Sequence, residues 1–125
     1  MACENNKTPQ ESAKELLSAY FDCRYADIES KVSPQMLNQM RFRASNLTQS
    51  EVELMAQTES SIEFVGTEEN GDTCVVTIIA DNVLLLDSLN NPGHIGRARY
   101  CLTMSKKDRK TWQGTKVQFV EEIKE

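Results

Sequence analysis

The N-terminal half of the chain has the apolar spacing of helices. After Pro9, apolar side chains recur every three or four residues and form one stripe of an amphipathic helix: Ala13, Leu16, Leu17, Tyr20 and Phe21. Thr8, Pro9 and Glu11 supply an N-cap, a first-turn proline and the acidic partner of a capping box. A helix is therefore predicted to begin at residues 8–9.

Two more helix starts follow in the sequence. Ser33-Pro34 repeats the pattern of a cap followed by proline, and Thr48 with Glu51 forms a second capping box. Apolar residues at helical spacing come after both starts. We predict two short helices here, and we expect the segment 41–47 between them to be partly loop.

After Glu59 the apolar period changes to two, which is typical of strands. Ile62 and Phe64 alternate with polar residues, and Asn70-Gly71 is a strong hairpin signal. The segment 75–86 is long and rich in β-branched residues, so it predicts a long, bent central strand.

Two further strands complete the sheet. Apolar and polar residues alternate around Tyr100, a turn is expected at 106–110, and a last strand covers 112–123. Early in that last strand the alternation of apolar and polar residues is interrupted. A β-bulge at Gly114 would explain the interruption. The predicted class is α+β: three N-terminal helices packed on a curved, roughly four-stranded antiparallel sheet.

The length and the net charge of the chain limit its domain organisation and its possible partners. The 125 residues are enough for one domain, which we place at 8–125 after a flexible tether at 1–7. The net charge of -5 disfavours nucleic acid as a partner. The apolar runs are far shorter than the roughly 18 residues of a membrane helix.

The first residues resemble the end of a bacterial lipobox. Ala2-Cys3 is followed by a polar stretch that would serve as a tether for an acylated cysteine. This predicts a lipid anchor on Cys3 and a place in the cell envelope, either lipid-anchored or periplasmic. An ordinary N-terminus of a cytoplasmic protein is the alternative.

Residues with catalytic or ligand chemistry are few. His94 is the single histidine, no cysteine pair has metal-ligand spacing, and no phosphate-binding glycine loop is present, so no metal and no cofactor are predicted. Arg97 and Arg99 fall on one face of a strand and could hold a carboxylate. The alternative is that they cover the solvated face of the sheet.

A family resemblance rests on short motifs spread over residues 8 to 122. They are Thr8-Pro9, Leu16-Leu17, Tyr20-Phe21, Ala26-Asp27-Ile28, Thr111-Trp112 and Val117-Gln118-Phe119-Val120. With the order of elements, they resemble the nuclear transport factor 2-like, or cystatin-like, superfamily, and within it small bacterial lipoproteins of unknown function. The resemblance implies a cone-like sheet wrapped on the first helix. The members of this superfamily include isomerases, dehydratases, transport adaptors and binding proteins, so the resemblance does not indicate one particular function.

The absence of a catalytic motif favours a non-enzymatic binding or interaction domain over an enzyme. We predict a small pocket between the first helix and the sheet, for an apolar or amphipathic ligand or a protein partner. Its expected lining is aromatic and apolar: Tyr20, Tyr100, Leu102, Met104 and Trp112.

Two alternatives stay open. One is an enzyme that uses a buried carboxylate for acid–base chemistry, for which Asp22, Asp27 and Asp81 are candidates by residue type alone. The other is a structural module that forms homodimers through its sheet.

Overall fold

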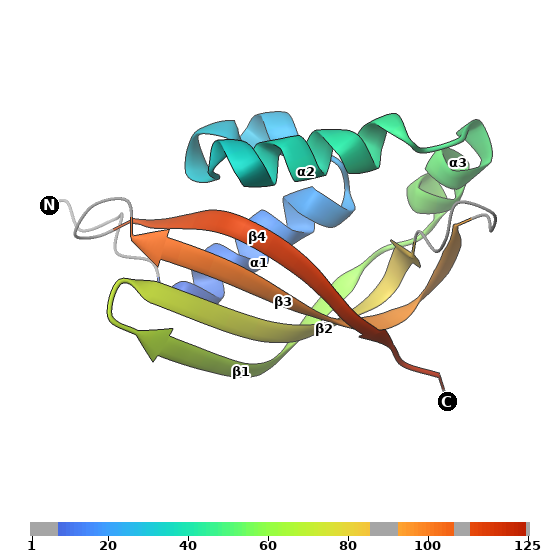
Figure 1. Ribbon diagram of the computed structural model, residues 1–125. Helices are drawn as coiled ribbons and strands as arrows, with labels where there is room; N and C mark the ends of the chain where they lie inside the picture. Colours follow the sequence, from blue (N-terminus) through green and yellow to red (C-terminus); the bar gives the residue numbers. More distant parts are fainter. Residues whose placement is uncertain (1–7, 86–92, 107–110, 125) are drawn as a thin grey trace, which may run out of the picture.

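The computed structural model describes residues 8–85, 93–106 and 111–124. Helices come first and strands second (Figure 1). The elements are α1 (Pro9–Phe21), the 3-10 helix η1 (Tyr25–Lys31), α2 (Pro34–Ser45), α3 (Gln49–Gln57), β1 (Ser61–Asn70), β2 (Thr73–Leu85), β3 (His94–Lys106) and β4 (Trp112–Glu122). The predicted α+β class is confirmed, with N-terminal helices packed on a four-stranded antiparallel sheet.

The three predicted helix caps are all present. The backbone amide of Glu11 donates to Thr8 Oγ1 at 3.1 Å, and the Glu11 carboxylate accepts from the Thr8 amide at 2.9 Å. Thr48 and Glu51 form the same reciprocal pair at the start of α3, and the Ser33 hydroxyl caps α2. These bonds satisfy amide groups that the first helical turn leaves open.

The segment 41–47 is partly loop, as expected: α2 continues to Ser45, and Asn46 and Leu47 lie outside the helix. Asn46 ends the helix, and its side-chain amide donates to the carbonyl oxygen of Phe42 at 2.7 Å. Arg43, in the last turn, is buried. A capped and buried last turn stays helical.

The sheet is an antiparallel meander in the order β1-β2-β3-β4. Gly71 forms the β1–β2 turn with a φ of 69°, as the Asn-Gly signal predicted. The predicted long strand β2 changes register between Ala80 and Val83. Next to Gly114 the register of β4 also shifts, since Met104 pairs with Gly114 and Thr103 with Lys116. The bulge predicted there is present.

All the helices lie on one face of the sheet (Figure 1). The predicted apolar stripe of α1 is entirely buried, and it packs with Met36 and Met40 of α2 on alternate side chains of the central strands. Those strand residues are Cys74, Val76, Ile78, Ala80, Ala98, Tyr100, Leu102 and Met104. In the described part of the chain, no helix is both long and apolar enough to cross a membrane.

Two helices approach β4 closely at Gly114. A Cβ atom on Gly114 would lie 2.7 Å from Sδ of Met36 in α2 and 3.0 Å from Cδ1 of Leu16 in α1. The Gly114 carbonyl accepts from the Ser33 amide at 2.7 Å, and a parallel bridge joins Gly114 to Val32. The missing side chain therefore allows α2 to start directly on the sheet.

Helix α2 also protects the outer edge of β4. The side-chain amide of Gln39 donates to the carbonyl oxygen of Val117 and accepts from the Val117 amide at 3.1 Å. One glutamine side chain thus makes both hydrogen bonds that a neighbouring strand would make at this residue.

We predict that Gly114→Ala lowers the free energy of unfolding by about 1–3 kcal/mol, because the added methyl group overpacks a buried contact. Urea denaturation followed by circular dichroism measures the change. Gly66→Ala is the matched control, because a Cβ at Gly66 would have nothing within 4 Å. Equal stability of the Gly114→Ala protein and the wild type would contradict the close-packing explanation.

Candidate functional site

The five residues predicted to line a ligand pocket are all buried on the helix side of the sheet. Tyr20 of α1 and Tyr100 of β3 come together, both in contact with Phe21. Trp112 lies at the far end of the sheet, where the Lys106 ammonium sits 5.3 Å from its ring centroid. The predicted lipid anchor, Cys3, lies outside the described residues.

Four aromatic side chains form a continuous cluster that runs from the core to the surface. Ring centroids are 5.3 Å apart for Tyr20 and Phe21, 4.9 Å for Phe21 and Tyr100, and 5.6 Å for Tyr100 and Phe119. All three pairs meet edge to face, the geometry that the ring quadrupoles favour. Phe119, on the edge strand β4, is 51% exposed, so this aromatic cluster reaches solvent there.

Arg43 of α2 is buried against the inner end of the aromatic cluster. Only 8% of the residue is exposed, and its guanidinium carbon lies 5.2 Å from the ring centroid of Tyr20 and 5.9 Å from that of Phe21. Nη2 donates to the carbonyl oxygen of Leu84 at 2.8 Å. Nε is buried without a hydrogen-bond partner.

The placement of Arg43 is energetically unusual. Within the described residues no carboxylate forms an ion pair with it, whereas the exposed Arg41 lies 4.0 Å from Glu29. Burial of an unsatisfied donor costs about 1–3 kcal/mol, and a buried cation normally has an anion beside it. Cation–π contacts with the two rings offset part of this cost.

The tyrosine hydroxyls near Arg43 are held in their protonated form. Burial raises the pKa of Tyr100 to about 12, and the guanidinium of Arg43 opposes part of that rise. Burial raises the pKa of Tyr20 for the same reason. At neutral pH both hydroxyls are protonated, as in any tyrosine, and can donate hydrogen bonds, as Arg43 does.

Cys23 adds a thiol to this end of the molecule. The amide of Arg24 donates to the Ala19 carbonyl at 2.8 Å, which closes the end of α1 and leaves Cys23 left-handed with a φ of 57°. Glycine is the usual residue in this conformation. Burial raises the pKa of the Cys23 thiol, and Arg43 lowers it by less.

Glu51 joins α3 to the start of β3. Its carboxylate accepts from the amide of Thr48 at 2.8 Å and from the amide of Gly93 at 2.6 Å. These backbone hydrogen bonds lower the pKa of Glu51, and Arg43 contributes a smaller effect in the same direction. Glu51 is the buried residue of α3, while Val52 and Leu54 are exposed.

A histidine–carboxylate pair lies at the same end of the sheet. His94 Nε2 is 3.0 Å from Glu122 Oε2, and both side chains are partly buried. The sequence carried no sign of this pair, because the two residues meet only through the pairing of β3 with β4. Among the described residues, no three His, Cys, Asp or Glu side chains are grouped as metal ligands.

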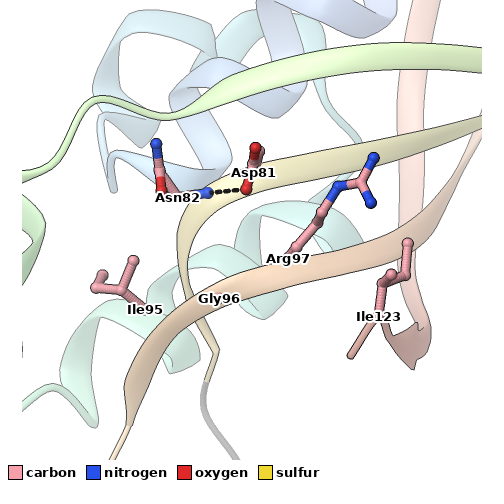
Figure 2. Close-up of a pocket in the computed structure, with 6 residues that line it drawn as sticks. All are labelled: Asp81, Asn82, Ile95, Gly96, Arg97 and Ile123. Carbon is pink, nitrogen blue, oxygen red and sulfur yellow. Dashed lines mark hydrogen bonds between the residues drawn. The ribbon is translucent and has the colours of Figure 1, made fainter. Parts of the chain in front are cut away.

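The other charged residues considered from the sequence lie apart from the aromatic cluster. Asp22 and Asp27 are exposed and both contact Arg24, at 3.5 and 3.1 Å. Asp81 lines an open cavity of about 350 Å³, together with Asn82, Ile95, Gly96, Arg97 and Ile123 (Figure 2). None of the five predicted ligand-binding residues lines this cavity.

The sequence interpretation missed Arg43, although its spacing gave a signal. Met36, Met40 and Arg43 follow one another at i, i+4 and i+7, so Arg43 extends the buried stripe of α2. A cation at such a position is a candidate for a functional group, because burial of an unpaired charge is unfavourable.

Comparisons with known proteins support the fold. No protein-family model matches the chain, and no curated protein matches it. A solved structure, the SEC-C motif containing protein from Rhodopseudomonas palustris, is similar with a TM-score of 0.55 and 14% sequence identity, over 91% of this chain and 80% of that one. At this identity the likeness concerns the α+β fold alone.

The Glu51 contacts predict a loss of stability in acid. Because the pKa of Glu51 is lowered by folding, its contribution is complete above the ordinary glutamate pKa of about 4.3 and is lost as the pH falls through the lowered value. Glu51→Gln removes the charge, so we expect the free energy of unfolding at pH 7 to fall by about 1 kcal/mol or more.

Urea denaturation from pH 7 to pH 3 measures both effects. Glu53→Gln is the control, since Glu53 is an exposed residue of the same helix. The difference between wild type and Glu51→Gln should shrink toward pH 3. A difference independent of pH would contradict the role of the Glu51 charge.

Proposed function

We propose that this protein is a non-enzymatic binding domain for an amphipathic ligand with an anionic head group, such as a medium-chain carboxylate. The observation that carries the proposal is the buried guanidinium of Arg43, whose Nε has no hydrogen-bond partner. A bound carboxylate would supply the missing acceptor and would place a negative charge in direct contact with the guanidinium.

The groups around Arg43 favour an anion over a cation or a neutral molecule. A tyrosine hydroxyl is protonated at neutral pH, and burial raises the pKa of Tyr20 and Tyr100 further, so both hydroxyls offer donors near the guanidinium. A carboxylate or a phosphate can accept from several such donors at once, whereas an ammonium group cannot accept at all.

The aromatic cluster favours an apolar tail on the same ligand. Phe119 is the outermost of its four rings and is half exposed, so it is the ring we expect a ligand to displace on the way to Arg43. An alkyl chain would then lie against Tyr100 and Phe21, replacing ring contacts with apolar contacts of similar area.

The alternative enzymatic function rests on the His94–Glu122 pair. A carboxylate 3.0 Å from an imidazole orients the ring, as in general-base catalysis. Arg43, by contrast, has a buried and unsatisfied donor that a ligand would complete. We therefore rank binding above catalysis.

We further propose that the chain is a nuclear transport factor 2-like domain of the cell envelope. The support is its order of elements, with α1 packed on an antiparallel sheet, and the sequence motifs that resemble this superfamily. A site between the helices and the sheet suits such a domain.

Ligand binding can be tested with octanoate, octanol and acetate by isothermal titration calorimetry. We expect octanoate to bind, octanol to bind at least tenfold more weakly, and acetate to bind too weakly for detection. Arg43→Met keeps the length and apolar volume of the side chain but removes its charge, so it should weaken octanoate binding at least tenfold. Arg41→Met is the matched control on the exposed side of the same helix.

A measurement of stability distinguishes a ligand-binding role of Arg43 from a purely structural one. Replacement of a poorly satisfied buried charge by a hydrophobic residue is often neutral or stabilising. We expect Arg43→Met to unfold at the same or a higher urea concentration than wild type. A large loss of stability, with no octanoate binding by the wild type, would make Arg43 a structural residue and would contradict the proposal.

The lipid anchor is tested separately. We expect a labelled fatty acid to be incorporated into the protein when it is expressed with a bacterial lipoprotein leader, and the label to be absent from Cys3→Ala, because the thiol is the acylated group. Cys23→Ala is the control. Absence of label from the wild type would contradict the proposal of a lipid-anchored protein.

A further inference from the structure

Strand β1 is an open edge of the sheet. It pairs with β2 on one side, and in the part of the chain that the structure describes no strand pairs with its other side (Figure 1). Antiparallel pairing uses the backbone N–H and C=O groups of every second residue, so those of the remaining residues of β1 point toward the open side. An additional extended strand can pair with such a row of backbone groups.

The two edges of the sheet differ in their protection. On β4 the carbonyl of Gly114 accepts from Ser33, and the side chain of Gln39 bonds both backbone groups of Val117. On β1 the side chain of Gln10 donates to the hydroxyl of Thr67 at 3.3 Å, a contact that occupies no backbone group. The sequence of β1 also contains neither lysine nor proline, with which edge strands are commonly protected.

A bulge limits how much of this edge one partner strand can use. The register of β1 shifts between Phe64 and Gly66, and a bulge bends a strand and interrupts its pairing. Residues 66–70 pair with β2 without a further shift. A Cβ atom on Gly66 would meet nothing within 4 Å, so the space beside the start of this stretch is open. The segment 66–70 is therefore the continuous pairing surface of the edge.

The segment 66–70 carries a negative charge on each face of the sheet. Glu69 pairs with Cys74, which faces the helices, whereas Glu68 pairs with Val75, so the two carboxylates lie on opposite faces. Both side chains are exposed, and within the described ranges neither forms an ion pair. Successive side chains of any strand alternate between faces, so two adjacent cations on a partner strand would match this pair of glutamates.

Exposed apolar side chains lie next to the segment 66–70. Phe64 is 37% exposed and Val65 is 52% exposed. Phe64 pairs with the buried Ile78, so it lies on the helix side of the sheet at the open edge. An apolar residue on a partner strand would cover Phe64 and bury part of its surface.

We infer that the β1 edge binds an extended basic segment of a partner protein, with two adjacent Lys or Arg residues beside Glu68 and Glu69 and an apolar residue against Phe64. Backbone hydrogen bonds to the segment 66–70 supply affinity, and the two carboxylates supply selectivity. A second copy of β1 fits less well, because it adds three more glutamates to the edge and no cation. The site lies at the edge of the sheet and is independent of Arg43.

Nuclear magnetic resonance titration of the full chain tests the inference with the peptide acetyl-Thr-Lys-Lys-Thr-Thr-Val-Thr-amide. We expect saturable amide shifts at residues 64–70 and slower hydrogen exchange there. Two control peptides should give no saturable shift at the same concentrations. One has glutamate in place of both lysines. The other keeps both lysines but is N-methylated at the adjacent Thr-Thr pair, which removes one hydrogen-bond donor from each of its edges.

Two variants of the protein sharpen the test. Glu68→Gln and Glu69→Gln should each weaken binding of the lysine peptide at least threefold. Glu53→Gln is the matched control, since Glu53 is an exposed glutamate of α3 and should leave binding unchanged.

Four outcomes would each overturn the inference. They are equal binding of the N-methylated peptide, which would reduce the effect to charge alone; unchanged binding in both glutamate variants; no shifts at residues 64–70; and self-association of the peptide-free protein through residues 66–70, which would assign the edge to a second copy.

Discussion

The close contact of two helices with Gly114 is the constraint on which the rest of the structure depends. Because Gly114 has no side chain, Met36 and Leu16 reach the backbone of β4, and the Ser33 amide bonds to it at the very start of α2. The position and direction of α2 follow from that contact. Two turns further on, the same helix brings Arg43 into the aromatic cluster.

Much of the fold could be predicted because its determinants are local. Thr8, Ser33 and Thr48 cap helices with neighbours three residues away, and the Asn70-Gly71 pair selects a hairpin turn through its own backbone preferences. The end of α2 was predicted only approximately. Its last turn is held by the tertiary burial of Arg43 as well as by the Asn46 cap.

The candidate sites depend on contacts between distant residues, and little of them could be predicted. Tyr20 and Tyr100 were predicted as site residues from their residue type. Arg43, the buried cation that lies against the aromatic cluster, was not predicted. The pair of His94 and Glu122 and the cavity at Asp81 both depend on register shifts in the sheet. A bulge moves every later side chain to a new neighbour, and the sequence pattern does not state which strand residue lies opposite.

The hydrogen bonds of Gln39 to Val117 have a consequence for how copies of this protein can assemble. Growth of a continuous sheet through many molecules requires two open edges on each, one to receive a strand and one to offer it. Here Val32, Ser33 and Gln39 occupy positions on the outer edge of β4, while β1 has no strand on its outer side among the described residues. Edge pairing is then favoured through the β1 strands, and a pair joined there presents only β4 edges that are covered at Gly114 and Val117. A single amide side chain thereby helps to keep an exposed four-stranded sheet from becoming the repeating unit of a fibril.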